Sequence, residues 1–161
     1  IKECPWATTG RVGGRKPNII TSLELRSEEM EVINLRIQKK YKEIEEKEVR
    51  FEEYLLEDAE YAIVAFGSAA RVAKNSIEIA RSQGIKVGLL RPITLWPFPT
   101  KEVQKLAGKV KGILSLEINA GQMVEDIRLA VEGKVPVQHF GRLGGIIPDP
   151  DEVVDAIKRL F

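Results

Sequence analysis

The chain has 161 residues and a formal net charge of +1, from 25 Lys and Arg against 24 Asp and Glu. This balance provides no overall field for nucleic acid or a membrane surface, so neither is predicted as a partner. No apolar run approaches the roughly 20 residues of a membrane span, and the basic start lacks the apolar stretch of a signal peptide. The sequence therefore predicts a cytoplasmic protein with one sizeable core and an appendage.

The cysteine content limits redox chemistry. Cys4 is the single cysteine, so an internal disulfide is excluded. An iron–sulfur cluster held by thiolates needs about four ligands, which this chain cannot supply alone. The chain opens in mid-phrase with "IKECPWATTG", and we expect it to be part of a longer protein.

Residues 1–26 are rich in Gly, Pro and Thr without a sustained period, which predicts an extended arm or the tail of a preceding domain. Residues 27–50 are predicted to form a linker helix. Its narrow apolar face has spacings of three and four residues. We expect this face to rest on a neighbouring domain in the complete subunit, and in this chain either on its own core or on another copy, which predicts homo-oligomer contacts; its members are Met30, Ile33, Ile37, Tyr41 and Ile44.

Residues 51–161 alternate strands with helices. The predicted strands are "YAIVAFG" (61–67), "IKVGLLR" (85–91), "KGILSLEI" (111–118) and "VPVQHFG" (135–141). Helices are predicted near 69–83, 99–109, 120–132 and 150–160. Nearly continuous apolar strands that alternate with helices predict an α/β fold, with a mostly parallel sheet covered by helices on both faces.

Two glycine-containing segments are weak candidates for phosphate binding. Gly67 and Ser68 follow the first predicted strand, but a single glycine is no dinucleotide fingerprint, and Ser68 is explained as a helix cap. The basic loop from Thr9 to Asn18 has neither a preceding strand nor the Lys-Ser/Thr ending of a phosphate loop. It is interpreted as a flexible arm.

The junction after the third predicted strand is a stronger candidate. Asn119 can cap the next helix, and Gly121, Gln122 and Met123 are predicted to form its first turn. An amide, a thioether and backbone donors would then gather at the carboxyl end of a strand, where open sheets bind their partners. The alternatives left open are ordinary helix capping and contact with a partner.

Two further groups are interpreted as structural. His139 is the only histidine, and no serine or cysteine nucleophile lies near it, which favours a structural role at a strand end. Asp149, Asp151 and Glu152 are interpreted as the cap and charge-matched first turn of the closing helix, in preference to a cation site.

The segment "VGLLRPITLWPFP" (87–99) predicts a rigid corner. Pro92 keeps Arg91 extended, and Pro97 and Pro99 suit the first turn of the next helix. The corner presents aromatic and apolar side chains from a segment with little entropy to lose on docking. This favours a packing or subunit interface over a reactive pocket; the corner residues are Leu95, Trp96, Pro97, Phe98 and Pro99.

Nearly the whole chain carries a family resemblance. "GIKVGLLRPITLWPFP" and "LSLEINAGQMVEDIRLAVEGKVPVQHFGRLGGIIPDPDEV" resemble the C-terminal part of the alpha chain of 2-oxoacid:ferredoxin oxidoreductases, closest to the ketoisovalerate (branched-chain) type. "NLRIQKKYKEIEEKEVRFEEY" resembles the linker helix of that subunit. The fold implied is the transketolase C-terminal-like domain, a three-layer α/β/α sandwich.

The resemblance also implies a function. The family enzyme uses thiamine diphosphate, Mg²⁺ and iron–sulfur clusters to convert a 2-oxoacid and CoA to acyl-CoA, passing electrons to ferredoxin through its other subunits. No catalytic, cofactor-binding or metal-binding residue can be carried over, because the Gly-Asp-Gly motif with a later Asn is absent. What carries over is packing, at the corner of residues 95–99 and the turn of residues 119–123.

Two other functions remain open at this point. The same fold forms the C-terminal domain of transketolases and of the beta chains of 2-oxoacid dehydrogenase complexes, so the chain could belong to one of these enzymes. A non-enzymatic α/β module that binds a nucleotide or partner at the strand ends is the third possibility. Fractionation of the native complex distinguishes the three functions. An iron chromophore would indicate the ferredoxin-dependent enzyme, a lipoyl-dependent partner would indicate a dehydrogenase complex, and the absence of both would indicate a binding module.

Overall fold

A computed structural model of the chain describes residue 10 and residues 12–14, 16, 17 and 19–160. The chain divides into two units, with the boundary between Lys40 and Tyr41. Each unit is described by itself. Residues 1–9, 11, 15 and 18 of the predicted arm lie outside the described residues, and they include Thr9, Arg11, Arg15 and Asn18 of its basic loop.

The first unit contains a short 3-10 helix, η1 (Val12–Gly14), and most of helix α1 (Ser27–Lys47), whose last residues belong to the second unit. No residue of α1 is buried. Along the predicted apolar face, Met30, Ile33 and Ile37 are only half-buried. The part of this face that lies in the first unit is thus without a full apolar covering, and its role as a linker stays a prediction. In the described part of the chain, no helix combines the length and apolarity needed to cross a membrane.

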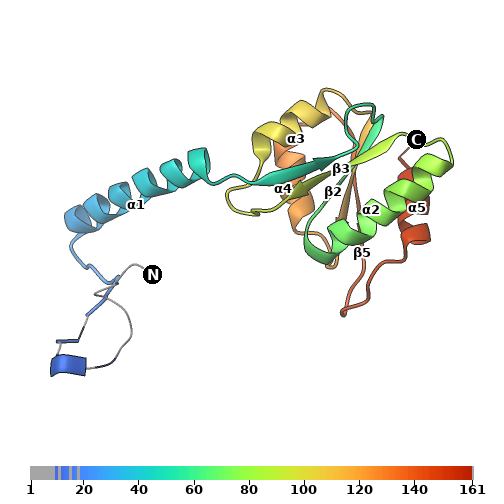
Figure 1. Ribbon diagram of the computed structural model, residues 1–161. Coiled ribbons are helices and arrows are strands. Elements are labelled where there is room, and N and C mark those ends of the chain that lie inside the picture. Colours follow the sequence, from blue (N-terminus) through green and yellow to red (C-terminus); the bar gives the residue numbers. More distant parts are fainter. Residues whose placement is uncertain (1–9, 11, 15, 18, 161) are drawn as a thin grey trace. The chain divides into compact units, whose positions relative to one another are not determined.

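The second unit is built on a five-stranded sheet with the order β1-β3-β2-β4-β5 (Figure 1). Strands β2 (Tyr61–Ala65), β3 (Val87–Pro92), β4 (Gly112–Glu117) and β5 (Val137–Gly141) are parallel. The edge strand β1 (Phe51–Tyr54) is antiparallel to β3. The predicted α/β fold with a mostly parallel sheet is confirmed.

Helices cover both faces of this sheet (Figure 1). Helices α2 (Gly67–Ser82) and α5 (Pro150–Lys158) contribute to one buried cluster with residues such as Ile63 and Leu114. Helices α3 (Thr100–Ala107) and α4 (Met123–Val131) contribute to the other, with residues such as Val64 and Ile113. Neighbouring residues of one strand thus enter opposite clusters, as the two-residue period of a strand requires. The result is three layers, α/β/α.

Strand β1 is absent from the sequence-based prediction, and this is the main correction to the fold. Its four residues are Phe-Glu-Glu-Tyr, and they alternate between exposed and half-buried positions. Two adjacent glutamates in so short a run favour no strand when they are seen alone. The strand forms because the open edge of β3 supplies the pairing, with Glu52 opposite Arg91.

The connection between β1 and β2 passes very close to β3. A Cβ atom added at Gly88 would overlap with the carbonyl oxygen of Leu55 and lie 2.7 Å from Cδ2 of Leu56. Because the first of these atoms belongs to the backbone, a side-chain rotation cannot make room for it. Gly88 therefore permits the connection to pack on the parallel sheet.

We predict that Gly88→Ala destabilises the chain by about 1–3 kcal/mol, as expected for overpacking in a tight interior. The matched control is Gly108→Ala, because Gly108 has helical dihedral angles and an added Cβ would make an ordinary 3.4 Å contact with the carbonyl oxygen of Lys105. The control should be neutral or stabilising by a few tenths of a kcal/mol. Urea unfolding measures both, and an equal effect of the two substitutions would contradict the close approach at Gly88.

Candidate functional site

The corner predicted at residues 95–99 forms the connection from β3 to α3. Pro97 and Pro99 are buried and anchor the corner in the domain, while Phe98 packs against the α3–α4 side of the core. Leu95 and Trp96 point away from this core and are 45% and 55% exposed. The corner is thus held in the domain by its buried residues, and it exposes the apolar side chains of Leu95 and Trp96.

Hydrogen bonds join the corner to the segment that precedes β1. The backbone N–H of Arg50 donates to Oγ1 of Thr94 over 3.0 Å, and the carbonyl oxygen of Arg50 accepts from the N–H groups of Ile93 and Thr94. The Thr94 hydroxyl also donates to the carbonyl oxygen of Pro97 at 2.9 Å. These bonds fix the backbone on both sides of Trp96.

The Trp96 ring contacts the ring of Tyr41, which belongs to α1. The ring centroids are 5.4 Å apart at an interplanar angle of 74°, an edge-to-face arrangement. Such pairs contribute about 0.5–1.5 kcal/mol beyond the area they bury. This contact orients the indole while leaving about half of it exposed.

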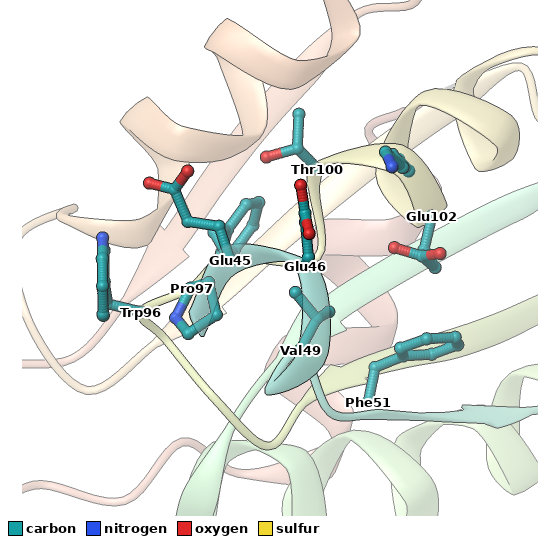
Figure 2. Close-up of a pocket in the computed structure, with 10 residues that line it drawn as sticks. Glu45, Glu46, Val49, Phe51, Trp96, Pro97, Thr100 and Glu102 are labelled. Carbon is teal, nitrogen blue, oxygen red and sulfur yellow. The ribbon is translucent and has the colours of Figure 1, made fainter. Parts of the chain in front are cut away.

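A pocket of about 530 Å³ lies beside the corner (Figure 2). Its apolar lining comes from Val49, Phe51, Trp96, Pro97 and Phe98, and its polar lining from Glu45, Glu46, Thr100, Lys101 and Glu102. Three carboxylates against one ammonium give the polar part of the lining a net negative charge. An apolar side chain flanked by basic groups is the ligand chemistry that this lining fits best.

The second predicted site, the turn of residues 119–123, is organised by a buried carboxylate that sequence analysis did not identify. Glu117, at the end of β4, is fully buried. Its oxygens accept the backbone N–H groups of Gln122, Met123 and Val124 at 3.0, 2.9 and 2.9 Å. The hydroxyl of Ser115 donates to the same carboxylate at 2.8 Å. Glu117 thereby occupies the position of an anion bound at the N-terminus of α4.

These donors decide the charge of Glu117. Burial, the largest single influence, raises the pKa of this carboxyl group, but the backbone donors of Gln122, Met123 and Val124 and the Ser115 hydroxyl together outweigh it. The net pKa is below the ordinary value. The group is therefore a carboxylate at neutral pH, and its bonds to α4 are charge-assisted.

The expected cap at Asn119 is corrected by this geometry. Asn119 Oδ1 accepts from the N–H of Gly121 at 2.7 Å, which closes the turn, and α4 begins only at Met123. Gln122 occupies the N-cap position without a side-chain cap bond. A Glu at the end of a strand, followed by five residues and then a helix, was the available signal, because such a side chain can reach the start of that helix.

The turn lies directly against β5. A Cβ at Gly141 would overlap with the carbonyl oxygen of Asn119, so only glycine fits opposite the turn. His139 lies beside it, with Nε2 3.9 Å from a Glu117 oxygen and without a hydrogen-bond partner among the residues that the structure describes. The structural role of His139 stays a prediction.

The structure does not join the two predicted sites into one pocket. Both follow the carboxyl ends of parallel strands, but β2 separates β3 from β4. None of the residues that line the pocket beside the corner comes from the turn. Whether the corner and the turn serve as contact surfaces stays a prediction.

The remaining candidates have mixed outcomes. The cap expected at Ser68 is wrong: α2 begins at Gly67, its N-cap residue is Phe66, and no side chain caps it. The cap expected at Asp149 is confirmed, because its carboxylate accepts the N–H of Asp151 while the N–H of Asp149 donates to Glu152. Among the residues that the structure describes, no three acidic, histidine or cysteine side chains gather closely enough to hold a metal ion.

The three layers and the strand order define an α/β domain of the transketolase-like fold. The solved 2-oxoglutarate:ferredoxin oxidoreductase from Magnetococcus marinus matches with a TM-score of 0.76 at 22% identity, over 96% of this chain and 28% of that chain. A split-gene transketolase matches with a TM-score of 0.55 at 15% identity, over 68% of this chain and 41% of that chain. At these identities the likeness establishes the fold.

The sequence comparisons place the chain in a family. The pyruvate:ferredoxin oxidoreductase core domain II family matches residues 59–153, more than half of the chain, and the chain belongs to this family. It is also 44% identical over 158 residues to the ketoisovalerate oxidoreductase subunit VorB of Methanothermobacter thermautotrophicus. That match covers 98% of this chain and 44% of the relative, so the chain spans less than half of the relative's length.

We predict that Glu117→Gln destabilises the chain by about 2–3 kcal/mol at neutral pH, because a charged acceptor of several hydrogen bonds is lost and an amide N–H₂ faces backbone donors. The control is Glu125→Gln, since Glu125 is an exposed residue of α4 that pairs with Arg128. This control should change stability by less than about 0.5 kcal/mol. Urea unfolding of the three proteins tests the difference.

The pH dependence gives a second readout of the same substitution. The folded-state pKa of Glu117 is lower than the ordinary value of 4.5, so its stabilisation is complete above that value and is lost as the pH falls through the folded-state pKa. The wild-type protein should therefore lose more stability on acidification below about pH 4.5 than Glu117→Gln does. Parallel stability curves over this range would contradict the role of the carboxylate.

Proposed function

We propose that this chain is the assembly domain of the alpha subunit of a 2-oxoacid:ferredoxin oxidoreductase of the ketoisovalerate type. The complete enzyme would convert a branched-chain 2-oxoacid and CoA to acyl-CoA and CO₂ and reduce ferredoxin. The similarity to a ketoisovalerate oxidoreductase subunit along nearly the whole chain supports this proposal. Family membership and the fold support the broader class.

The chemistry would reside outside the residues described here. Thiamine diphosphate is held through Mg²⁺, which takes oxygen ligands such as carboxylates. The described residues provide no acidic cluster of that kind, and the sequence contains one cysteine for any iron–sulfur cluster. These residues do not fit the cofactors, so no step of the reaction is assigned to them.

The observation that carries the assembly role is the exposure of Trp96 on a fixed frame. An indole that is 55% exposed in the chain, and that precedes the buried Pro97 in a hydrogen-bonded corner, loses little conformational freedom when a partner covers it. Tryptophan is also among the residues that contribute most to protein interfaces. The adjacent pocket, with its apolar and acidic lining, would receive a partner side chain.

The turn of residues 119–123 would contribute to the same function in a different way. Asn119 is half-buried, Gln122 is exposed and Met123 is buried, so this turn offers polar groups at its surface. The Glu117 carboxylate fixes the backbone that bears them. We propose that the turn supplies hydrogen bonds at a contact in which the corner supplies apolar area.

We predict that Trp96→Ala weakens assembly with the other subunits by about tenfold or more, because truncation of an interface hot spot commonly costs about 2 kcal/mol or more. The chain alone should lose only about 0.5–1.5 kcal/mol, from the ring contact with Tyr41. Enzyme that does assemble should keep near-normal turnover per active site. Analytical gel filtration of reconstituted enzyme measures the first effect and steady-state turnover the last.

The matched control is Leu129→Ala, which removes an apolar side chain that is 77% exposed on α4 and does not line the pocket beside the corner. This variant should assemble normally. The proposal is wrong if Trp96→Ala assembles and melts like the wild-type enzyme but loses turnover, since that result would place the indole against substrate or cofactor.

A further inference from the structure

A small pocket with a cationic lining lies beside the N-terminus of α2, apart from both predicted contact sites. Its volume is about 150 Å³, and it is lined by Gly67, Ala70, Arg71, Lys74 and Arg91. Pockets for whole cofactors or drug-sized ligands usually measure about 300–1,000 Å³. This pocket has space for one small chemical group.

The charges around the pocket do not balance. Lys74 and Arg91 both donate to Glu52 on β1, Arg91 through Nη1 at 3.0 Å. The bond from Lys74 is the main influence that holds the pKa of Glu52 below its ordinary value, so Glu52 is negative at neutral pH. Glu78, one turn after Lys74, instead accepts from the hydroxyl of Tyr54. Three cations against the single carboxylate that pairs with them leave two positive charges without a counter-charge in the pocket.

Arg71 has unused hydrogen-bond donors at this pocket. It is exposed and forms no ion pair with any residue that the structure describes. Arg91 also lines the pocket, and 38% of its side chain is exposed. Its Nε is inaccessible to solvent, so the guanidinium would contribute through its other nitrogen atoms. The pocket therefore has more hydrogen-bond donors than acceptors.

The backbone adds donors at the same place. Helix α2 has 16 residues, and no side chain caps its first N–H groups. These N–H groups carry the partial positive charge of the helix N-terminus, which favours an anion. Gly67, the first residue of α2, lines the pocket, so the helix start and the cationic side chains border the same space.

We propose that this pocket binds one phosphate group, either as free phosphate or as the terminal phosphate of a larger ligand. A tetrahedral phosphate accepts from several directions at once, which matches guanidinium groups on β3 and α2 together with backbone donors at the start of α2. A planar carboxylate would leave more of these donors unpaired. The site is independent of the corner and the turn, and of the activity proposed for the complete enzyme.

Calorimetric titration of this chain with inorganic phosphate, at constant ionic strength, tests the proposal. Wild-type protein should bind with saturation, and Arg71→Gln should weaken binding by about fivefold or more, since one charge-assisted hydrogen bond is lost. Arg71 is exposed and unpaired, so this variant should fold normally. The matched control Arg128→Gln removes an exposed arginine of α4 and should bind phosphate like the wild type.

Two further titrations identify the ligand. Acetate should bind at least tenfold more weakly than phosphate if the site selects a tetrahedral group. ADP that binds more tightly than phosphate indicates the terminal phosphate of a larger ligand, and equal or weaker binding indicates free phosphate. Amide NMR signals of Gly67 and Ser68 should shift on titration.

The proposal is overturned if phosphate shows no saturable binding, or if acetate binds as tightly as phosphate. It is also overturned if Arg128→Gln weakens binding as much as Arg71→Gln, because that result would indicate general charge attraction without a site.

Discussion

The turn and the helix that follow β4 depend on one buried carboxylate. Glu117 is the last residue of β4 and is fully buried. Its oxygens accept the backbone N–H groups of Gln122, Met123 and Val124 at the start of α4. An isolated buried charge would be very unfavourable, so its retention requires these donors to remain in place. The carboxylate thereby determines where α4 begins, how the turn of residues 119–123 is shaped, and how closely that turn lies against β5 at Gly141.

The corner at residues 95–99 is fixed by different means at the same edge of the sheet. Buried prolines and the bonds between Thr94 and Arg50 hold its backbone, and no buried charge is involved. This difference suits the two surfaces to different contacts. The corner presents aromatic and aliphatic area beside an acidic pocket, whereas the turn presents amide groups on a backbone held by a charge. A domain that offers both from one rigid sheet can support assembly without reactive side chains of its own.

Much of the fold could be predicted from periodicity, because buried parallel strands are nearly continuous apolar runs. The strands β2 to β5 overlap the predicted runs, and α2 to α5 lie where helices are expected. Strand β1 could not be predicted, since its pairing comes from β3, far away along the chain. The caps at Ser68 and Asn119 were wrong for a related reason. At α4 the anion comes from the end of the preceding strand, and at α2 no side chain supplies one.

The same reason explains which sites could be predicted from the sequence. The corner could be predicted because its prolines and its aromatic residues are neighbours in the sequence. The pocket at α2 could not be predicted, because Arg91, Lys74 and Glu52 belong to three different elements that only the folded sheet brings together. Local patterns therefore located the surfaces built from one segment and missed those built from several.

We propose that the corner at Trp96 becomes an interface when the complete enzyme assembles. Hydroxyl-radical footprinting of Trp96 tests this directly, by comparing the chain alone with the purified complete enzyme. The indole is 55% exposed in the chain, so it should be labelled there and protected in the enzyme, while Leu129, at 77% exposure, stays labelled in both. Equal labelling of Trp96 in the two samples would contradict the assembly role.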